Sequence, residues 1–249
     1  HRNPVGEANI LQGYTKLKYF LGNVNLSYEI LKGLNLGANF SLSNLSNYTY
    51  SFHVPFQVRD VQDDPQREFS YLSEYDSEMR RINQEYTVNY NFQVGEKHVF
   101  DLLAGYQRIS EPFRETFAQA EGYKLDEDGN KVPAIILDPS FNTLNAFSDG
   151  TYSASGTNAE YALVSQFGRI NYAYDGKYLL QASIRRDGSS KFGKNNKYGN
   201  FPSFALGWKI TDENFMKDQN IFDFLKLRYS WGQAGNDSAL GYYDYVALI

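Results

Sequence analysis

The sequence predicts an all-β protein, a segment of an antiparallel transmembrane β-barrel with about nine strands. Three observations predict this class: apolar and polar side chains alternate strictly, the connections alternate between short and long, and aromatic residues are abundant. Aromatic residues form 16% of the 249-residue chain, with 21 Tyr and 18 Phe. Successive strand residues point to opposite faces, so each alternating segment has one apolar face and one polar face. Such segments suit a wall between lipid and water.

Four strands are predicted in the first half of the chain, near residues 15–30, 34–46, 80–94 and 98–111. The second alternates regularly from Leu34 to Ser43. The third and fourth have apolar rows at every other position: Tyr86, Val88, Tyr90, Phe92 and Val94, and then Phe100, Leu102, Ala104 and Tyr106. In the fourth strand, Val99 and Leu103 add apolar side chains to the polar row, so its alternation is less regular.

Five more strands are predicted near residues 159–174, 177–187, 201–211, 223–233 and 242–249. Each again has apolar side chains at alternate positions. These rows are Ile170, Tyr172 and Tyr174; Tyr178, Leu180, Ala182 and Ile184; Phe204, Leu206, Trp208 and Ile210; Leu225, Leu227, Tyr229 and Trp231; Tyr243, Tyr245, Ala247 and Ile249.

The basic side chains of these strands decide which face meets lipid. An Arg or Lys at the bilayer midplane of a barrel costs about 2–4 kcal/mol, so we expect basic rows to face an aqueous lumen. A soluble sheet with a dry core on one side predicts the same arrangement, and the connections must therefore separate the two classes. The basic residues on the polar parity are Arg169, Arg185, Lys209, Lys226 and Arg228.

The predicted connections run short, long, short, long. Short turns are predicted at Lys32-Gly33, 95–97 and Asp175-Gly176, where Asp-Gly supplies the positive φ angles of a two-residue hairpin. Barrels of the outer-membrane type have short periplasmic turns and long extracellular loops, whereas a sandwich does not sort its loops by length. The long excursions are predicted at 47–79 and 112–158, with a shorter one at 188–200.

One connection on the short side departs from this rule. The segment 212–222 is longer than a turn, and we expect it to hold one helical turn capped by Thr211 or Asp212.

Composition excludes several classes of protein. The mean hydropathy is −0.54, and the longest aliphatic run, Ala134 to Leu137, is far shorter than the ~20 residues of a membrane-spanning helix. The absence of Cys excludes disulfides, thiolate metal sites and thiol catalysis. The net charge of −5 argues against binding to nucleic-acid phosphates. A tyrosine-rich soluble β-sandwich fits the composition too, although tyrosine also collects at membrane interfaces.

No motif supports a catalytic, cofactor-binding or metal-binding site, and the substrate-binding residues are unknown. His1, His53 and His98 are too scattered for a metal cluster. The acidic run 126–130 lacks the ligand spacing of an EF-hand, so we expect a polar hairpin tip in an extracellular loop. The basic loop 187–200 lacks the Gly-Lys-Ser/Thr ending of a phosphate-binding loop.

Aromatic residues are interspersed with Asp, Asn, Gln and Arg in the predicted long loops. Rings beside such groups can stack on sugars or peptides, or they can simply pack the loops together. The sequence leaves both interpretations open. The residues are Phe52, Phe56, Phe69, Tyr71, Tyr75, Phe113, Phe117, Tyr123, Phe141 and Phe147.

A series of ordered motifs fills residues 165–236. In order they are Gly168-Arg169-Ile170-Asn171-Tyr172, Lys177-Tyr178-Leu179-Leu180, Arg186-Asp187-Gly188-Ser189-Ser190-Lys191-Phe192-Gly193, Phe201-Pro202-Ser203, Trp208, Asn214-Phe215-Met216-Lys217, Leu225-Lys226-Leu227-Arg228 and Gly235-Asn236. Their types and order closely resemble the C-terminal half of the SusC/RagA family of TonB-linked outer-membrane transporters. Glu213 stands one place before Asn214, where the family has an acidic residue in a periplasmic segment. The preceding part fits more loosely, with Asn3-Pro4 resembling the entry to an earlier strand.

The resemblance implies a barrel of about 22 strands, plugged by an N-terminal domain and driven by TonB and the proton-motive force. It implies import of oligosaccharides, or in some members peptides, across the outer membrane of a Gram-negative cell. The implied partners are a SusD-like surface lipoprotein, the TonB complex acting through an N-terminal part, membrane lipid and the imported ligand. Neither nucleic acid nor a cofactor is expected.

We expect residues 1–249 to form one partial barrel domain without the plug and the final strands. The chain begins at His1 without an initiator Met and ends inside an alternating stretch, so we expect a piece of a longer polypeptide. It would supply wall, lumen lining and part of the extracellular surface, with the lipoprotein docked on 47–79 and 112–158. The alternative is a soluble β-sheet carbohydrate-binding module, which would stay in the aqueous phase without detergent. An outer-membrane enzyme is a third hypothesis, weakened by the lack of a catalytic constellation.

Overall fold

The computed structural model describes residues 11–53, 69–133, 143–147, 150–193, 195–219 and 221–244. Contacts within the chain define two compact units. The first unit comprises residues 1–20, 44–80 and 112–159, and the second comprises residues 21–43, 81–111 and 160–249. The boundary falls inside several long strands, which contribute residues to both units.

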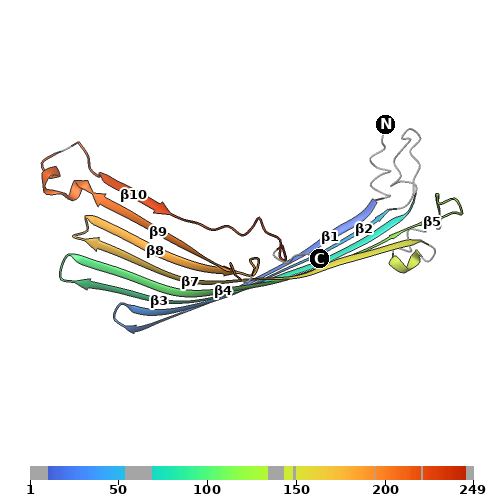
Figure 1. Ribbon diagram of the computed structural model, residues 1–249, viewed down its shortest axis with the longest axis horizontal. Coiled ribbons are helices and arrows are strands. Elements are labelled where there is room, and N and C mark those ends of the chain that lie inside the picture. Colours follow the sequence, from blue (N-terminus) through green and yellow to red (C-terminus); the bar gives the residue numbers. More distant parts are fainter. Residues whose placement is uncertain are drawn as a thin grey trace. The chain divides into compact units, whose positions relative to one another are not determined.

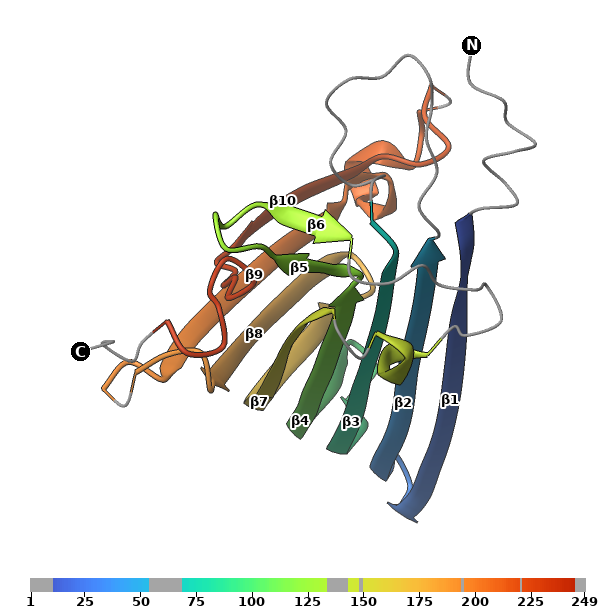
Figure 2. The ribbon, with the colours of Figure 1, turned by 90° about the vertical axis from the view of Figure 1, so that its right-hand side faces the viewer.

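Eight strands form one sheet in the order β1-β2-β3-β4-β7-β8-β9-β10, and β5 pairs with β6 in a separate hairpin (Figures 1 and 2). The pairs β7–β8, β8–β9 and β9–β10 are antiparallel, and the order in the sheet follows the chain. The all-β class is thus confirmed. The strands are β1 (Leu11–Leu31), β2 (Leu34–His53), β3 (Tyr71–Val94), β4 (His98–Glu121), β5 (Tyr123–Leu125), β6 (Lys131–Pro133), β7 (Thr151–Tyr174), β8 (Tyr178–Ser189), β9 (Tyr198–Lys209) and β10 (Lys226–Gly232).

From β1 to β4 and in β7, the strand predictions are accurate beside the short turns and too short at the opposite ends, whereas β10 is shorter than the predicted 223–233. β3 begins at Tyr71 rather than near 80, β4 continues to Glu121 rather than stopping near 111, and β7 begins at Thr151 rather than near 159. Alternation of side chains fades in these extensions, while the hydrogen-bonded backbone continues as strand. A ladder needs only paired backbone groups, so it can outlast the apolar pattern.

The long excursions predicted at 47–79 and 112–158 are correspondingly wrong in extent. Much of each range belongs to strands, and the actual connections are 54–70 and 122–150. The second connection contains the β5–β6 hairpin and the 3₁₀ turn η2 (Leu144–Ala146).

The ninth predicted strand, 242–249, is not found in its described part. Residues 242–244 form a turn, and 245–249 lie outside the described residues.

The connection predicted at 212–222 extends from 210 to 225 and holds two short 3₁₀ turns, η3 (Ile210–Asp212) and η4 (Asn214–Met216). The predicted cap is wrong, because Lys209 and Glu213 hold the N-cap positions and neither makes a side-chain cap hydrogen bond. The Glu213 carboxylate is instead engaged by side chains of β8 and β9, as described below.

The Asp175-Gly176 turn has the predicted geometry. Asp175 and Gly176 have φ angles of 52° and 65°, and the Lys177 N–H donates to the Tyr174 carbonyl at 3.0 Å. Positive φ at both central residues is the requirement of a type I′ turn. Asp175 is the only non-glycine residue with positive φ among the described residues.

The acidic run 126–130 forms the predicted hairpin tip between β5 and β6. The Asp126 carboxylate accepts the backbone N–H groups of Asp128 at 3.0 Å and Asn130 at 2.8 Å. These bonds, the one from Asn130 first, lower the pKa of Asp126 below its ordinary value. The carboxylate therefore organises a turn, as Asp does in an Asx motif.

The first unit contains a small buried cluster formed by Tyr50, Phe52, Leu72, Ala120 and Phe147. Phe147 follows η2 and packs against the ends of β2, β3 and β4, so the 122–150 connection covers one side of this region. The cluster closes a local core around three strand ends.

None of the helical turns in the described ranges has the length and hydropathy that a membrane-spanning helix requires.

Candidate functional site

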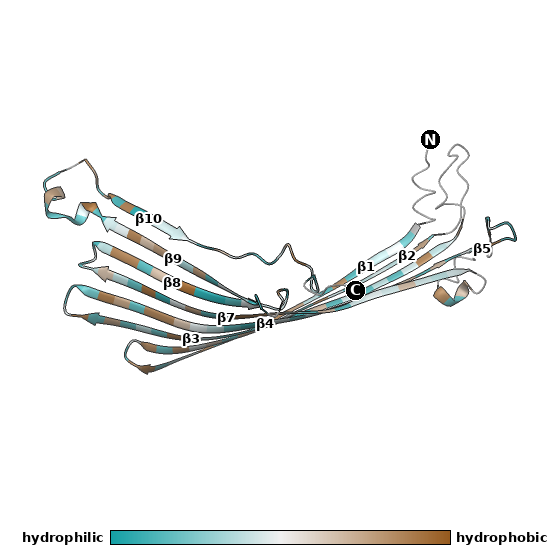
Figure 3. Cartoon of the chain, in the orientation of Figure 1, coloured by the Kyte–Doolittle hydropathy of each residue, from teal (hydrophilic) through white to brown (hydrophobic). Residues whose placement is uncertain are grey.

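One face of the sheet in the second unit is apolar across four strands. Antiparallel register aligns Tyr172, Leu180, Leu206 and Tyr229 in one row, and Ile170, Ala182, Phe204 and Trp231 in the next. Figure 3 shows the resulting bands of high and low hydropathy along β7, β8 and β9. Leu206 is 48% exposed and Tyr229 is 59% exposed. A contiguous exposed apolar surface of this kind indicates contact with another apolar phase or with a partner.

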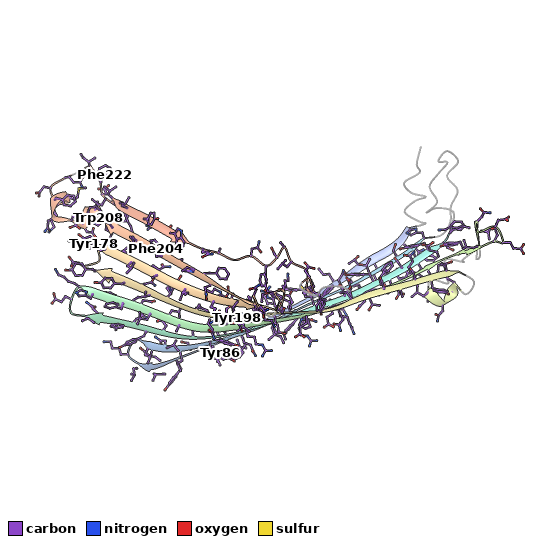
Figure 4. The ribbon with its side chains drawn as sticks, viewed as in Figure 1. Tyr86, Tyr178, Tyr198, Phe204, Trp208 and Phe222 are labelled. Carbon is purple, nitrogen blue, oxygen red and sulfur yellow. The ribbon has the colours of Figure 1, made fainter. Side chains whose placement is uncertain are left out.

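Aromatic side chains gather where this face meets the short connections. Tyr178 and Trp208 stack with ring centroids 6.5 Å apart, and Phe215 of η4 lies 6.5 Å from Trp208. Figure 4 shows Tyr178 and Trp208 at the same end of the neighbouring strands β8 and β9. Aromatic girdles of this type mark the membrane–water interfaces of barrels, because their rings tolerate lipid and their polar atoms seek water.

Glu213 ties the η3–η4 connection to this aromatic girdle. Its carboxylate accepts the Tyr178 hydroxyl at 2.5 Å and the Trp208 Nε1–H at 3.0 Å, and Lys177 Nζ lies 3.8 Å away. The Tyr178 hydrogen bond, followed by the Trp208 bond, lowers the pKa of Glu213. The acidic residue that the sequence analysis marked only by resemblance thus orients two girdle side chains.

The opposite face of the second unit carries a polar network centred on Arg185. Its Nη2 donates to Gln107 Oε1 at 2.7 Å and to Ser165 Oγ at 2.8 Å, and its Nε donates to Asp187 Oδ1 at 2.8 Å. The guanidinium carbon lies 5.3 Å from the centroid of the Phe167 ring. Three strands, β4, β7 and β8, therefore meet at one charged side chain.

A second ion pair lies on the same polar face. Arg169 Nη2 is 3.8 Å from Asp101 Oδ1, and the Asn171 amide donates to the same oxygen at 3.4 Å. Arg169 and Arg185 thus each have an acidic partner within this chain. Lys209 and Lys226 stand directly opposite each other, and Arg228 is opposite Gly207, so the predicted basic parity is confirmed.

A third cluster joins the segment after β10 to β7 and β8. Asp237 Oδ2 accepts the Tyr161 hydroxyl at 3.0 Å and the Ser189 hydroxyl at 2.6 Å, while Lys191 Nζ donates to the Asp237 carbonyl at 3.3 Å. Counted from the short turn that follows β7, Tyr161 lies beyond the ~10 strand residues needed to cross a bilayer. Burial raises the pKa of the Tyr161 hydroxyl to about 12. Sequence reasoning missed Asp237, although it directly follows the Gly235-Asn236 motif.

In the first unit, a cavity of about 540 Å³ opens among the ends of β2, β3 and β4. Four of the ten loop aromatics named in the sequence analysis have one of two roles. Phe52 and Phe147 are fully buried in the core cluster, whereas Phe69 and Tyr71 line the cavity. Phe56 and Phe141 lie outside the described residues. The cavity lining is Ser51, His53, Phe69, Ser70, Tyr71, Gln119, Glu121 and Lys131.

The histidines have separate surroundings. His98 shares a 2.8 Å hydrogen bond between its Nδ1 and the Tyr172 hydroxyl, His53 packs on Tyr71, and His1 lies outside the described residues. Within the described ranges, no group of three or more His, Asp or Glu side chains could hold a metal ion.

Comparison with known proteins gives consistent relatives. A family model described as "TonB dependent receptor-like, beta-barrel" matches residues 2–247. TonB-dependent receptor P3 of Formosa agariphila is 31% identical over 240 residues, which cover 96% of this chain and 22% of that protein. TonB-dependent receptor SusC of Bacteroides thetaiotaomicron is 50% identical over 86 residues, covering 34% of this chain and 9% of SusC.

Among solved structures, the RagAB peptide importer in its open-open state aligns with a TM-score of 0.80 at 25% identity. The alignment covers 97% of this chain and 25% of that chain. The closed-closed state aligns with a TM-score of 0.77 at 26% identity. The chain spans less than a quarter of the length of the curated relatives named above, which are receptors rather than enzymes.

Proposed function

Since the chain belongs to the TonB-dependent receptor-like β-barrel family, we propose that it forms part of the wall of a SusC-type active transporter in the outer membrane of a Gram-negative cell. The observation that carries the proposal is the division of the second unit into two faces. Exposed apolar rows lie in register on one face, and the Arg185 and Asp101 networks lie on the other. The apolar face contacts lipid and the charged face borders the transport path, because charge is costly against acyl chains.

The imported ligands in this proposal are oligosaccharides, with peptides as the alternative. SusC is a relative with half of its aligned residues identical, which supports the first class. The neighbouring structure is that of a peptide importer, which supports keeping the second. Residue identities on the polar face suit either ligand, since amides, hydroxyls and guanidinium groups bind both.

The external partner in this proposal is a SusD-like lipoprotein, and the energy comes from TonB through an N-terminal part of the whole receptor. We predicted a docking surface at 47–79 and 112–158. Only 54–70 and 122–150 of these ranges connect strands, and the proposed docking surface is limited to them. A deletion of 112–158 would remove parts of β4 and β7 and disturb the sheet itself. The informative change is therefore replacement of the β5–β6 hairpin, residues 123–133, by a short Gly-Ser linker, which leaves Phe147 in the buried cluster.

Energised uptake tests the function. The full-length receptor and its SusD-like partner should import a labelled oligosaccharide or peptide, and a proton uncoupler should abolish the import. The 123–133 replacement should weaken co-purification of the lipoprotein while the receptor still inserts. Import that persists with the uncoupler, or without the receptor, would count against an active transporter. Unchanged lipoprotein binding would count against the docking surface alone.

A soluble carbohydrate-binding module is not favoured. Such a module would need its apolar rows covered, whereas Leu206, Tyr229 and Trp231 are about half exposed or more, at 48%, 59% and 48%. Detergent-free extraction separates the two functions, because only the module would remain in the aqueous fraction.

A further inference from the structure

We infer that the cavity of the first unit binds one uncharged, hydroxyl-rich sugar ring. This inference rests on the proposed transport function and gives it a ligand class and a place in the chain. The cavity lies at the ends of β2, β3 and β4 farthest from the short turns, with one side formed by Lys131 of β6. Four elements of the first unit therefore converge on one space.

The cavity and the core cluster use alternate residues of the same strand ends. Phe52, Leu72 and Ala120 belong to the core, and the adjacent His53, Tyr71 and Glu121 line the cavity. Successive strand residues point to opposite faces, so the cavity lies on the face opposite the core. A packed core behind the strand ends holds the lining in place, as a pre-formed binding site requires.

Aromatic rings form part of the cavity wall. The His53 and Tyr71 rings pack with centroids 4.9 Å apart and an interplanar angle of 39°. Phe69 adds a third ring to the lining and lies 5.5 Å from Tyr123 by ring centroids. Aromatic faces offer a flat apolar surface, which matches the C–H face of a pyranose ring.

Hydrogen-bonding groups surround these rings. The Tyr71 hydroxyl donates to Gln119 Oε1 at 3.4 Å, and the Gln119 amide donates to Glu121. Ser70 is completely buried, and its hydroxyl has no hydrogen-bond partner among the described residues. Because the Ser70 hydroxyl is buried, the polar groups of the lining that a ligand hydroxyl can reach are those of Tyr71, Gln119 and Glu121.

The charges of the lining compensate each other. Glu121 Oε2 lies 3.8 Å from Lys131 Nζ, so these two opposite charges are paired. The other lining side chains are uncharged, apart from His53, which can be protonated. Burial lowers the pKa of His53, so its ring is neutral at neutral pH. A neutral site disfavours an anionic sugar or a peptide terminus, because either would bring an unpaired charge. The volume of about 540 Å³ is within the ~300–1,000 Å³ of small-molecule sites.

Calorimetric titration of the full-length receptor tests the inference. The probes are maltohexaose, cellohexaose and mannohexaose, with hexagalacturonic acid and hexa-alanine as charged and peptide comparators. We expect a neutral hexasaccharide to bind, and Tyr71→Ala to weaken that binding about tenfold. Tyr71→Phe keeps the aromatic ring, so it should weaken hexasaccharide binding less than Tyr71→Ala does. Tyr75→Ala is the matched control, because Tyr75 is on the same strand and bonds Glu115 at 2.9 Å without lining the cavity.

Three results would overturn the inference: no neutral hexasaccharide binds, Tyr71→Ala binds like the parent, or Tyr71→Ala weakens only a comparator. Heat-modifiable gel migration verifies that each variant receptor is folded, and Tyr71→Phe maintains the test if Tyr71→Ala fails to fold. Energised uptake distinguishes the two proposals. If Tyr71→Ala takes up the probes as the parent does, the sugar-binding role of the cavity is rejected and the transport function stands. If the parent takes up none of the probes, the transport function is rejected.

Discussion

Gly105 shows how tightly side chains pack on the polar face of the second unit. A Cβ at this position would lie 2.2 Å from Phe167 Cζ, and the Phe167 ring carries the Arg185 guanidinium on its face. The ring cannot move away without disturbing the hydrogen bonds that converge on Arg185. Gly105 thus matters for the space it leaves rather than for backbone freedom.

We expect Gly105→Ala to destabilise the receptor by about 1–3 kcal/mol through overpacking. Gly168→Ala is the control, because its nearest neighbour is the Leu103 carbonyl oxygen at an ordinary 3.7 Å. Thermal loss of the heat-modifiable form of the full-length receptor measures the difference. Equal midpoints for the two variants would show that Phe167 has room to shift.

His53 makes the first unit sensitive to acid. Burial lowers its folded pKa, so the folded state binds fewer protons than the unfolded state as pH decreases. Its contribution to stability is complete above the ordinary His pKa of about 6.5 and is lost as pH falls through the lowered folded pKa. Protonation would also place an unpaired charge beside Tyr71.

Hydrogen exchange near residues 51–53 and 71–72 should therefore accelerate as pH falls from about 7 to about 5, after correction for the intrinsic exchange rate. His53→Gln should remove this pH dependence, because the amide does not titrate. An unchanged pH dependence in that variant would assign the effect to another group.

At the scale of elements, the β5–β6 hairpin depends on one carboxylate at its tip. Asp126 accepts two backbone N–H groups and lies within 3.4 Å of the Asn130 side-chain amide. Glu127 is in the same turn, is exposed and makes no side-chain hydrogen bond among those of the described residues. The two acids are therefore a matched pair for mutation.

We expect Asp126→Ala to open the hairpin and to speed protease cleavage within 126–130 by a few-fold, because cleavage follows the open population. Glu127→Ala should be cleaved at the parental rate. Limited proteolysis with mass-spectrometric mapping measures both, and equal rates for the two variants would mean that strand pairing alone holds the tip.

The observed strand ends show where the alternating sequence pattern stops although backbone pairing continues. Residues 112–121 and 151–158 are strand without regular alternation, so the pattern predicted loops there. Apolar and polar side chains alternate only where one face of the strand contacts an apolar environment. The ladder of backbone hydrogen bonds continues wherever backbone groups have partners. The strand ends at the short turns were predictable because glycine readily adopts the positive φ angles of tight turns. Gly33, Gly95 and Gly176 have such angles.

For the molecule as a whole, the assignment of one face to lipid is the central claim. Leu206 and Ala205 are neighbours on β9, and their side chains point to opposite faces. Leu206→Arg should cost about 2–4 kcal/mol by placing a charge against acyl chains, whereas Ala205→Arg should be tolerated on the aqueous side.

The yield of folded, heat-modifiable receptor in outer-membrane fractions measures this difference. We expect a clear loss for Leu206→Arg and a near-parental yield for Ala205→Arg. Equal yields would contradict the lipid assignment, and a reversed order would mean that the faces are exchanged.

The class, the apolar and polar faces, the short turns and the family were all readable from the chain. Each depends on residues that are close in sequence: an alternating row, an Asp-Gly pair, or a run such as 186–193. The Arg185 and Asp237 networks, the true strand lengths and the cavity appeared only in three dimensions. They join residues such as Gln107 and Arg185, or Ser189 and Asp237, which are distant in the chain and become neighbours only through cross-strand register and loop packing.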